Sequence, residues 1–247
     1  MPGKTVLILG GTRDARDLAR LLDARGYRVI TSLAGVTTDP VLPPGEVRRG
    51  GFGGADGLAD YLAREAIGVV ADATHPFAAR ISGHAHAACE RLGVPLLRLE
   101  RPAWQPEPDD RWTDVADAAA AAHALPEGAR VLLTIGRRQL EPFFDRPELS
   151  GIIRCIEPPD ATLPPGWRLL RERPPYSFAA ETGLIRSNAI SHLVSKNSGG
   201  EAVAAKLMAA RALAIPVIMI ARPKKPETAT AATADALAMA VERLLCP

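Results

Sequence analysis

The sequence contains few cysteines and few aromatic residues, and it lacks long apolar runs. It has only three cysteines, Cys89, Cys155 and Cys246. This odd and widely spaced set favours neither a disulfide framework nor a zinc site, and we expect no metal site. Aromatic residues make up 4% of the chain, and no apolar run reaches the ~18 residues of a membrane-spanning helix. The N-terminus leads directly into an apolar strand without a signal-peptide pattern, so we expect a cytoplasmic protein that does not contact membranes.

Several catalytic signatures are also missing. The sequence contains no G-x-S-x-G elbow, no H-E-x-x-H motif, no P-loop lysine and no CxxC pair, which argues against hydrolase, metalloprotease and kinase functions. The net charge of +2 is small, and 25 of the 30 basic residues are arginine. Without a concentrated basic stripe we expect no nucleic-acid binding, whereas arginine suits bidentate contacts to carboxylates and phosphates.

A strand-to-helix turn near the N-terminus carries the clearest functional motif. An apolar run leads into Gly10, Gly11 and Thr12, and apolar residues at helical spacing then predict a helix over residues 12–25. Glycines at such a turn allow the backbone to approach a bulky anion, toward which the helix directs unpaired N–H groups. Gly10, Gly11 and Thr12 are therefore predicted to hold the phosphates of a nucleotide. The alternative is a tight turn without a ligand, because the motif is not a full G-x-G-x-x-G.

The second predicted strand, residues 27–32, bears on the choice of cofactor. NAD-binding folds commonly place an acidic residue about 20 residues beyond the glycines, where it binds the ribose 2′-hydroxyl. Here that region ends in Ser32 and contains no acid, while Arg13 and Arg16 lie beside the phosphate loop. We therefore expect NADPH, with Ser32 and both arginines in the cofactor site. The alternative is that the two arginines belong to a solvated helix face.

Strand and helix patterns alternate along most of the chain. Strands are expected at residues 69–73, 95–99, 130–135, 192–195 and 216–221, and helices at residues 55–65, 76–92, 178–185 and 199–213. This alternation predicts α/β architecture with parallel sheets that are covered on both faces. The pattern collapses at residues 100–111, which favours a linker. We expect two Rossmann-like parallel-sheet domains, residues 1–103 for the nucleotide and residues 104–247 for further substrate and cofactor contacts, with a crevice between them.

A first polar cluster follows the strand that ends near residue 73. Asp72, Thr74, His75 and Phe77 lie beyond a strand's carboxyl end, where ligands bind in open α/β sheets. Asp72 can accept a hydrogen bond from a ligand N–H, and His75 can donate to a carboxylate or relay a proton. Both are candidate catalytic residues, and Thr74 and Phe77 are candidates for substrate binding. The alternative is that Asp72 and Thr74 cap the next helix and His75 packs beside them.

A second cluster follows the strand at residues 130–135. Gly136 ends this strand, and Arg137 and Arg138 come directly after it. Paired arginines are suited to acidic groups on a substrate or cofactor, and we expect both to bind substrate. The alternative is a surface turn whose charges are solvated.

A third cluster follows the strand at residues 192–195. Lys196, Asn197, Ser198 and Gly199 resemble a second close-approach loop, in which Lys196 supplies a positive charge to an anion. All four are candidates for substrate binding. Ser198 and Glu201 also form an S-x-x-E capping box, which predicts the start of the following helix.

Four of these segments occur in an informative order. They are residues 10–12, 72–78, 132–140 and 196–200, the last followed by residues 205–207 and 215–220. In this order and spacing they resemble the precorrin-6A reductase family of cobalamin (vitamin B12) biosynthesis over nearly the whole chain. Asp14 stands where members of the family often have Glu, and Ser195 where they often have Thr. Neither departure affects the glycine framework.

The resemblance implies NADPH-dependent reduction of one double bond in the precorrin-6A macrocycle, which gives precorrin-6B. The nicotinamide carries the hydride, so the protein binds, orients and supplies electrostatics. The many carboxylates of the macrocycle need cationic partners, for which Arg137, Arg138 and Lys196 are candidates. His75 is the candidate for assisting the proton transfer, and the alternative is that solvent delivers the proton. The place in the pathway also implies transient contacts with other corrin-pathway enzymes.

Two other functions stay open on the sequence alone. One is another NAD(P)-dependent reductase or epimerase, which would differ only in its substrate. The other is a non-catalytic sensor that closes on a nucleotide or carboxylate, although the chain has no appended DNA-binding helices to transmit a signal. Turnover distinguishes them, because a sensor binds NADPH without consuming it. Whether the macrocycle contains cobalt is also left open.

Overall fold

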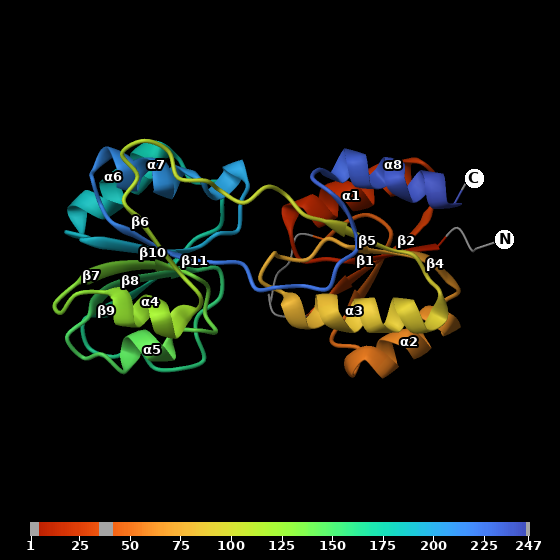
Figure 1. Ribbon diagram of the computed structural model, residues 1–247, viewed down its shortest axis with the longest axis horizontal. Coiled ribbons are helices and arrows are strands. Elements are labelled where there is room, and N and C mark those ends of the chain that lie inside the picture. The colour runs from red at the N-terminus through yellow and green to blue at the C-terminus, as the bar shows by residue number, and fades with distance from the viewer. Residues whose placement is uncertain (1–4, 35–41, 246–247) are drawn as a thin grey trace. The chain divides into compact units, whose positions relative to one another are not determined.

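The chain forms two compact units, each built on one parallel sheet. The structure is a computed structural model that describes residues 5–34 and 42–245. Unit 1 consists of Met1–Pro102 and Pro223–Pro247, and unit 2 consists of Ala103–Arg222. Each sheet has six strands, all of them paired in parallel, and helices on both faces (Figure 1). The predicted α/β class with two Rossmann-like parallel-sheet domains is confirmed.

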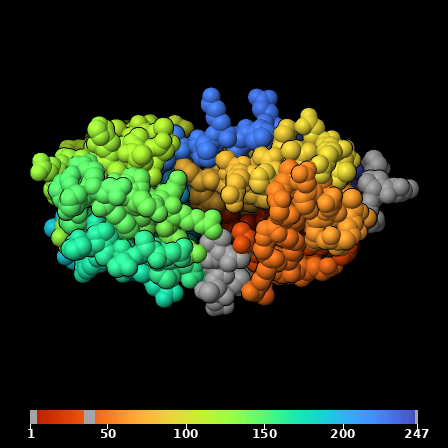
Figure 2. All heavy atoms as spheres, turned by 90° about the horizontal axis from the view of Figure 1, so that it is seen from below, coloured from red at the N-terminus to blue at the C-terminus, as the bar shows by residue number. Residues whose placement is uncertain are grey.

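The sheet of unit 1 has the strand order β12-β5-β4-β1-β2-β3. Its strands are β1 (Thr5–Leu9), β2 (Arg28–Leu33), β3 (Glu46–Arg49), β4 (Ile67–Asp72), β5 (Leu96–Leu99) and β12 (Ala229–Ala231). Helices α1 (Arg13–Ala24) and α8 (Ala234–Leu245) cover one face, and α2 (Gly54–Arg64) and α3 (Ala79–Leu92) cover the other. Figure 2 views the molecule from the side of α2 and α3, whose orange and yellow side chains hide the strands behind them.

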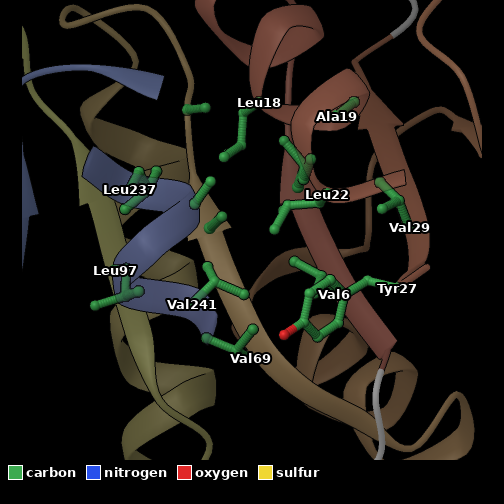
Figure 3. Packing of buried hydrophobic residues seen from close by; sticks show 14 of the residues in the cluster. Val6, Leu18, Ala19, Leu22, Tyr27, Val29, Val69, Leu97, Leu237 and Val241 are labelled. Atoms are coloured by element: carbon green, nitrogen blue, oxygen red, sulfur yellow. The ribbon is translucent and has the colours of Figure 1, made fainter. Parts of the chain in front are cut away.

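The C-terminal segment belongs to unit 1, whereas the sequence analysis expected residues 104–247 to form one domain. Strand β12 pairs in parallel with β5, and Leu237 and Val241 of α8 are fully buried against Leu18 and Leu22 of α1. Figure 3 shows these side chains pointing toward one another above the sheet. Helix α8 is amphipathic and packs its apolar face beside α1, so that the two helices together cover this face of the sheet.

The sheet of unit 2 has the strand order β6-β11-β10-β7-β8-β9. Its strands are β6 (Trp112–Val115), β7 (Arg130–Thr134), β8 (Ser150–Cys155), β9 (Trp167–Arg171), β10 (His192–Lys196) and β11 (Val217–Ile220). Its helices are α4 (Ala118–Ala124), α5 (Glu141–Phe144), α6 (Phe178–Ser187) and α7 (Ala205–Ala212). In Figure 1, α6 and α7 lie on one face of this sheet, and α4 and α5 lie on the other.

The expected capping box in unit 2 was wrong. Gly200 precedes a short 3₁₀ turn, Glu201–Val203, and no side chain caps that turn; helix α7 begins only at Ala205. Residues 198–200 form a loop instead. In this loop Gly199 has a φ angle of 66° and Gly200 has a φ angle of 89°. A backbone of this shape cannot enter a helix at Ser198, so the S-x-x-E spacing has no helix terminus to cap.

Candidate active site

One row of residues crosses the sheet of unit 1 near the carboxyl ends of its strands. Strand register places Leu9 of β1 beside Ser32 and Ser32 beside Arg48. On the other side, Leu9 lies beside Asp72, Asp72 beside Arg98, and Arg98 beside Thr230. Residues in register project to the same face of a sheet, and ligands of open α/β sheets bind at the carboxyl edge. The row therefore brings polar side chains from five of the six strands, all except β1, to the edge where the glycine turn lies.

The glycine turn itself has the geometry of a close-approach loop. Gly11 has a φ of 107°, and a Cβ atom added there would meet no other atom within 4 Å. A Cβ on Gly10 would lie 2.8 Å from the Thr31 side chain, and the Gly10 N–H donates to the Ser32 carbonyl at 2.9 Å. Gly10 is thus required for packing against β2, while Gly11 leaves space beside the first turn of α1, whose N–H groups have no intrahelical acceptors.

Thr12 holds this loop to its neighbour. Its hydroxyl accepts a hydrogen bond from the Ala15 N–H at 3.0 Å, which caps α1, and donates to the Ala73 carbonyl at 2.8 Å. The Thr12 side chain is therefore occupied by the protein, so its contact with a phosphate would be made by the backbone N–H. The same hydroxyl joins the glycine turn to the segment that carries Thr74 and His75.

Arg13 and Arg16 lie in the first turn of α1, beside the glycine turn, and differ in their contacts. Arg13 is 71% exposed and forms an ion pair with Asp17 at 3.6 Å. The Arg16 guanidinium donates to the Thr12 carbonyl at 3.3 Å, which keeps it next to the loop.

Arg48 is a cofactor-site candidate that the sequence analysis missed. Its guanidinium donates to the Ser32 hydroxyl at 3.3 Å and to the carbonyls of Gly50 and Gly51 at 2.6 Å each. It also lies 3.8 Å from the ring centroid of Phe52. These contacts hold a cation and a hydroxyl together at the end of β2, where dinucleotide folds bind the ribose. The sequence contained a signal for this residue, namely two arginines in the short strand before the glycine-rich residues 50–54. That pattern alone does not indicate a cofactor site.

Asp72 lies in the site region, but its carboxylate is fully used by the protein. The side chain is 0% exposed, and Oδ2 accepts from Arg98 Nε at 3.2 Å. Oδ1 accepts from the Thr74 N–H at 3.2 Å and from the Thr74 hydroxyl at 2.6 Å. A buried carboxylate with these three donors shapes the turn after β4.

His75 lies beyond this turn and is exposed, and Phe77 is half-buried beside it. The Phe77 N–H donates to His75 Nδ1 at 3.2 Å, and the two ring centroids are 5.8 Å apart. Because Nδ1 accepts this bond, neutral His75 carries its proton on Nε2. The structure therefore brings the glycine turn, Thr74 and His75 to one edge of unit 1.

The basic candidates of unit 2 follow two adjacent strands. Arg137 and Arg138 come after β7, and Lys196 ends β10, which pairs with β7. Arg137 binds the Asp160 carboxylate at 2.7 Å and the Pro158 carbonyl at 3.1 Å, whereas Arg138 is exposed. Burial lowers the pKa of Lys196 to about 8, so part of its population is neutral near that pH.

The loop after β10 is anchored to the backbone of Trp104 through Asn197. The Asn197 side chain accepts from the Trp104 N–H at 2.8 Å and donates to the Trp104 carbonyl at 3.0 Å. Its amide is thereby engaged by the backbone, which leaves it little capacity for a substrate. Ser198 and Gly199 are buried, and Gly199 has a φ of 66°.

A buried group of charges in unit 2 was also missed. Arg154 of β8 makes a bidentate ion pair with Glu181 of α6, and both side chains are at most 3% exposed. The ring of Tyr176 covers the Arg154 guanidinium at 3.9 Å, and Lys206 of α7 lies 5.2 Å from the ring centroid of Trp104. The sequence did contain a signal, because each of the apolar stretches 150–155 and 205–210 includes one charged residue. Burying a charge is costly, so a charged residue in such a stretch indicates a specific structural reason for it.

The described residues contain neither a membrane-spanning helix nor a cluster of metal ligands. Among residues 5–34 and 42–245, no helix has the length and apolar character to cross a membrane. Within the same ranges, no group of three or more His, Cys, Asp or Glu side chains is placed to hold a metal ion. Cys89 and Cys155 are buried free thiols, and Cys246 lies outside the described residues.

Comparison with known proteins confirms the resemblance found in the sequence. A family model described as "Precorrin-6x reductase CbiJ/CobK" matches residues 5–242. A precorrin-6A reductase of Rhodococcus erythropolis is 51% identical over 223 residues, which are 90% of each chain. A cobalt-precorrin-6A reductase of Synechocystis sp. is 32% identical over 238 residues, which are 89% of each chain. A solved structure of "CobK precorrin-6A reductase" is 44% identical, with a TM-score of 0.92 over 97% of this chain and 96% of that one. This chain belongs to the precorrin-6x reductase family.

Proposed function

We propose that this protein catalyses the NADPH-dependent reduction of one double bond in precorrin-6A, giving precorrin-6B, in the biosynthesis of cobalamin. The relative named for precorrin-6A is 51% identical to this chain, and the relative named for cobalt-precorrin-6A is 32% identical. This difference favours the metal-free macrocycle as the substrate. The protein would act in the cytoplasm, with transient contacts to the other enzymes of the corrin pathway.

The glycine turn at the end of β1 is the observation that supports the nicotinamide cofactor most directly. Its left-handed Gly11, the open space beside that residue and the first turn of α1 fit a pyrophosphate, which Gly10, Gly11 and Thr12 would hold through their backbone. When bound, the nicotinamide supplies the hydride.

Ser32 and Arg48 support the choice of NADPH. A 2′-phosphate at the end of β2 would accept hydrogen bonds from the Ser32 hydroxyl and the Arg48 guanidinium, which are already 3.3 Å apart. Arg13 and Arg16 add positive charge beside the turn, and no described acidic side chain is bonded to Arg48 or Ser32 in competition.

Residues of this chain would then supply the proton that completes the reduction. Hydride transfer to a conjugated imine-like acceptor must be completed by a proton at the neighbouring atom, and we assign this step to His75 as the imidazolium. Nδ1 then takes a proton from solvent in place of its hydrogen bond from the Phe77 N–H, and His75 is left neutral after it delivers the Nε2 proton. Asp72 acts through Thr74 by holding the turn that presents His75, since both of its oxygens are bonded within that turn and to Arg98.

The carboxylates of the macrocycle are assigned to the cations of unit 2. Arg138 and Lys196 are the main candidates, and Arg137 adds to them by exchanging its exposed partner Asp160 for a substrate carboxylate. Thr74 and Phe77 of unit 1 would contact the ring system. Ser198 and Gly199 would let the loop after β10 approach it, with Asn197 anchoring that loop rather than binding substrate.

The test is NADPH oxidation by the purified protein with and without precorrin-6A, followed by absorbance and product mass. We expect oxidation that depends on the substrate, a mass gain of two hydrogen atoms, and much slower turnover with NADH. NADPH binding without oxidation would support the nucleotide site but contradict the proposed reaction. Oxidation with cobalt-precorrin-6A alone would contradict the metal-free substrate.

A further inference from the structure

The chain passes between its two units twice, and the two crossings share a sequence pattern. The first crossing leaves unit 1 after β5, and the second leaves unit 2 after β11 (Figure 1). Each of these strands is followed by one residue and then by an arginine and a proline. They are Arg101 and Pro102 in the first crossing and Arg222 and Pro223 in the second. A pattern that recurs at both crossings indicates a common role.

In both crossings the arginine fastens the chain to the unit that the chain is leaving. Arg101 forms an ion pair with Asp14 at 2.6 Å, and both residues belong to unit 1. Arg222 Nε donates to the Asn197 carbonyl at 2.8 Å, and both residues belong to unit 2. Asp14 lies in the first turn of α1, and Asn197 directly follows Lys196 at the end of β10. The departing ends are therefore fixed beside the glycine turn and in the loop after β10.

The arriving ends of the crossings are fastened through backbone groups. The Asn197 side chain binds both the N–H and the carbonyl of Trp104, which is the second residue of unit 2. In unit 1, Arg98 Nη1 donates to the Pro226 carbonyl at 3.0 Å. Each of these contacts joins two residues of the same unit. Each therefore fixes its end of a crossing independently of the other unit.

Short segments lie between the fastened ends, residues 102–103 in the first crossing and residues 223–225 in the second. Pro102 and Pro223 have no N–H group, so neither can donate a hydrogen bond to a neighbouring strand. Their rings also restrict φ and the conformation of the preceding arginine. Rotation between the fastened ends is thus confined to a few backbone bonds, which is the arrangement of a hinge.

We propose that the two crossings form a double hinge, in which residues 102–103 and 223–225 bend while the fastened ends stay with their own units. Bending would change the separation between the glycine turn, next to Asp14, and the loop that carries Lys196. Asn197 is a positioning residue in this arrangement, because it holds the arriving end of one crossing and the departing end of the other. The hinge does not depend on the proposed function, and its test uses the protein without ligands.

Distances between two spin labels test the bending. In a chain whose native cysteines are replaced by alanine, Asp60→Cys in α2 and Ala179→Cys in α6 put one label at an exposed position of each unit. Pulsed electron paramagnetic resonance then gives the distribution of distances between the labels. We expect Pro102→Gly combined with Pro223→Gly to broaden this distribution, because glycine removes the restriction on φ. Pro147→Gly, in an exposed turn of unit 2, is the matched control and should not broaden it. An unchanged distribution in the double variant would overturn the hinge.

Trypsin tests the fastening of the second crossing. Because proline follows both Arg222 and Lys225, trypsin can cut this crossing only at the bond between Lys224 and Lys225. Arg222→Met should speed this cleavage about tenfold, since one hydrogen bond from a charged group is lost and cleavage follows the population of the opened segment. Cleavage after Arg186, within α6, reports on unfolding of unit 2 and should keep its native rate. Equal acceleration at both bonds, or none at the crossing, would overturn the fastening role of Arg222.

Asn197→Ala tests the positioning residue. It frees the backbone of Trp104 and should broaden the distribution of label distances, while cleavage after Arg186 stays at its native rate. The matched control is Asn188→Ala, which removes the other asparagine of the chain, bonded to the Leu184 carbonyl within unit 2. This control should keep the native distribution. A native distribution in Asn197→Ala, or the same broadening in Asn188→Ala, would overturn the role of Asn197.

Discussion

Replacing Lys206 by Met should stabilise unit 2 below neutral pH and lose that advantage at alkaline pH. Lys206 is 5% exposed, and no hydrogen bond or ion pair to its ammonium is found within residues 5–34 and 42–245. Burial and, to a lesser degree, Arg154 lower its pKa to about 7, while Glu181 acts in the opposite direction. Met has a similar length and fills the same space without a charge.

The sign and size of the effect follow from proton linkage. Between pH 10.5 and about 7 the unfolded chain binds a proton on Lys206 that the folded protein does not, so the free energy of unfolding rises with pH across this window. The lowered pKa corresponds to roughly 5 kcal/mol at about 1.4 kcal/mol per pH unit. The contact with the Trp104 ring offsets about 2 kcal/mol of this cost. We therefore expect the stability difference between the variant and the native protein to be about 3 to 5 kcal/mol larger at about pH 6 than at about pH 10.

Urea denaturation followed by tryptophan fluorescence is a suitable assay. All three tryptophans, Trp104, Trp112 and Trp167, lie in unit 2, so the signal reports on that unit. Lys224→Met, which removes an exposed lysine, is the control and should change stability by less than about 0.5 kcal/mol at every pH. A stability difference for Lys206→Met that does not vary with pH would refute the reasoning.

Three further predictions concern the proposed active site. Arg48→Gln should reduce the preference for NADPH over NADH at least about tenfold, as measured by the two dissociation constants, because a charge-assisted bond to the 2′-phosphate is lost; an unchanged ratio would place the 2′-phosphate elsewhere. His75→Ala should slow the single-turnover reduction about a hundredfold while NADPH affinity holds, and an unchanged rate would exclude His75 as the proton donor. Thr12→Val removes two hydrogen bonds and should lower the free energy of unfolding of unit 1 by about 1 to 3 kcal/mol in urea, monitored by amide hydrogen exchange in α1. An undisturbed α1 would show that the Thr12 hydroxyl contributes little there.

Local patterns were sufficient for the first half of unit 1. An apolar run, two glycines, a capping threonine and an apolar stripe at helical spacing predict β1, the turn and α1, and each of these signals lies within a few residues of the structure it forms. The carboxyl-edge position of residues 72–77 followed in the same way, because strands of one parallel sheet end at a common edge.

Strands β8 and β9 show where local patterns are insufficient. Ser150–Cys155 includes a glycine and an arginine, and Trp167–Arg171 is flanked by prolines, so neither segment has a clear strand period. Both form strands because of their neighbours. A Cβ at Gly151 would lie 1.9 Å from the Val131 carbonyl oxygen, so glycine is what lets β8 approach β7, and Arg154 in β8 is tolerated only because Glu181 reaches it from α6.

The sequence by itself determined the fold class, the glycine turn after β1 and the family, since all three are carried by short motifs and by their order along the chain. Only the tertiary structure decided which candidate side chains are available for chemistry. Arg98 occupies the Asp72 carboxylate from 26 residues away, and the Trp104 backbone occupies the Asn197 amide from 93 residues away. Strand β12 likewise joins β5 and brings the C-terminal segment into unit 1. Hydrogen-bond partners so distant along the chain produce no periodic pattern in the sequence, because it is the packing of the helices and strands against one another that brings them together.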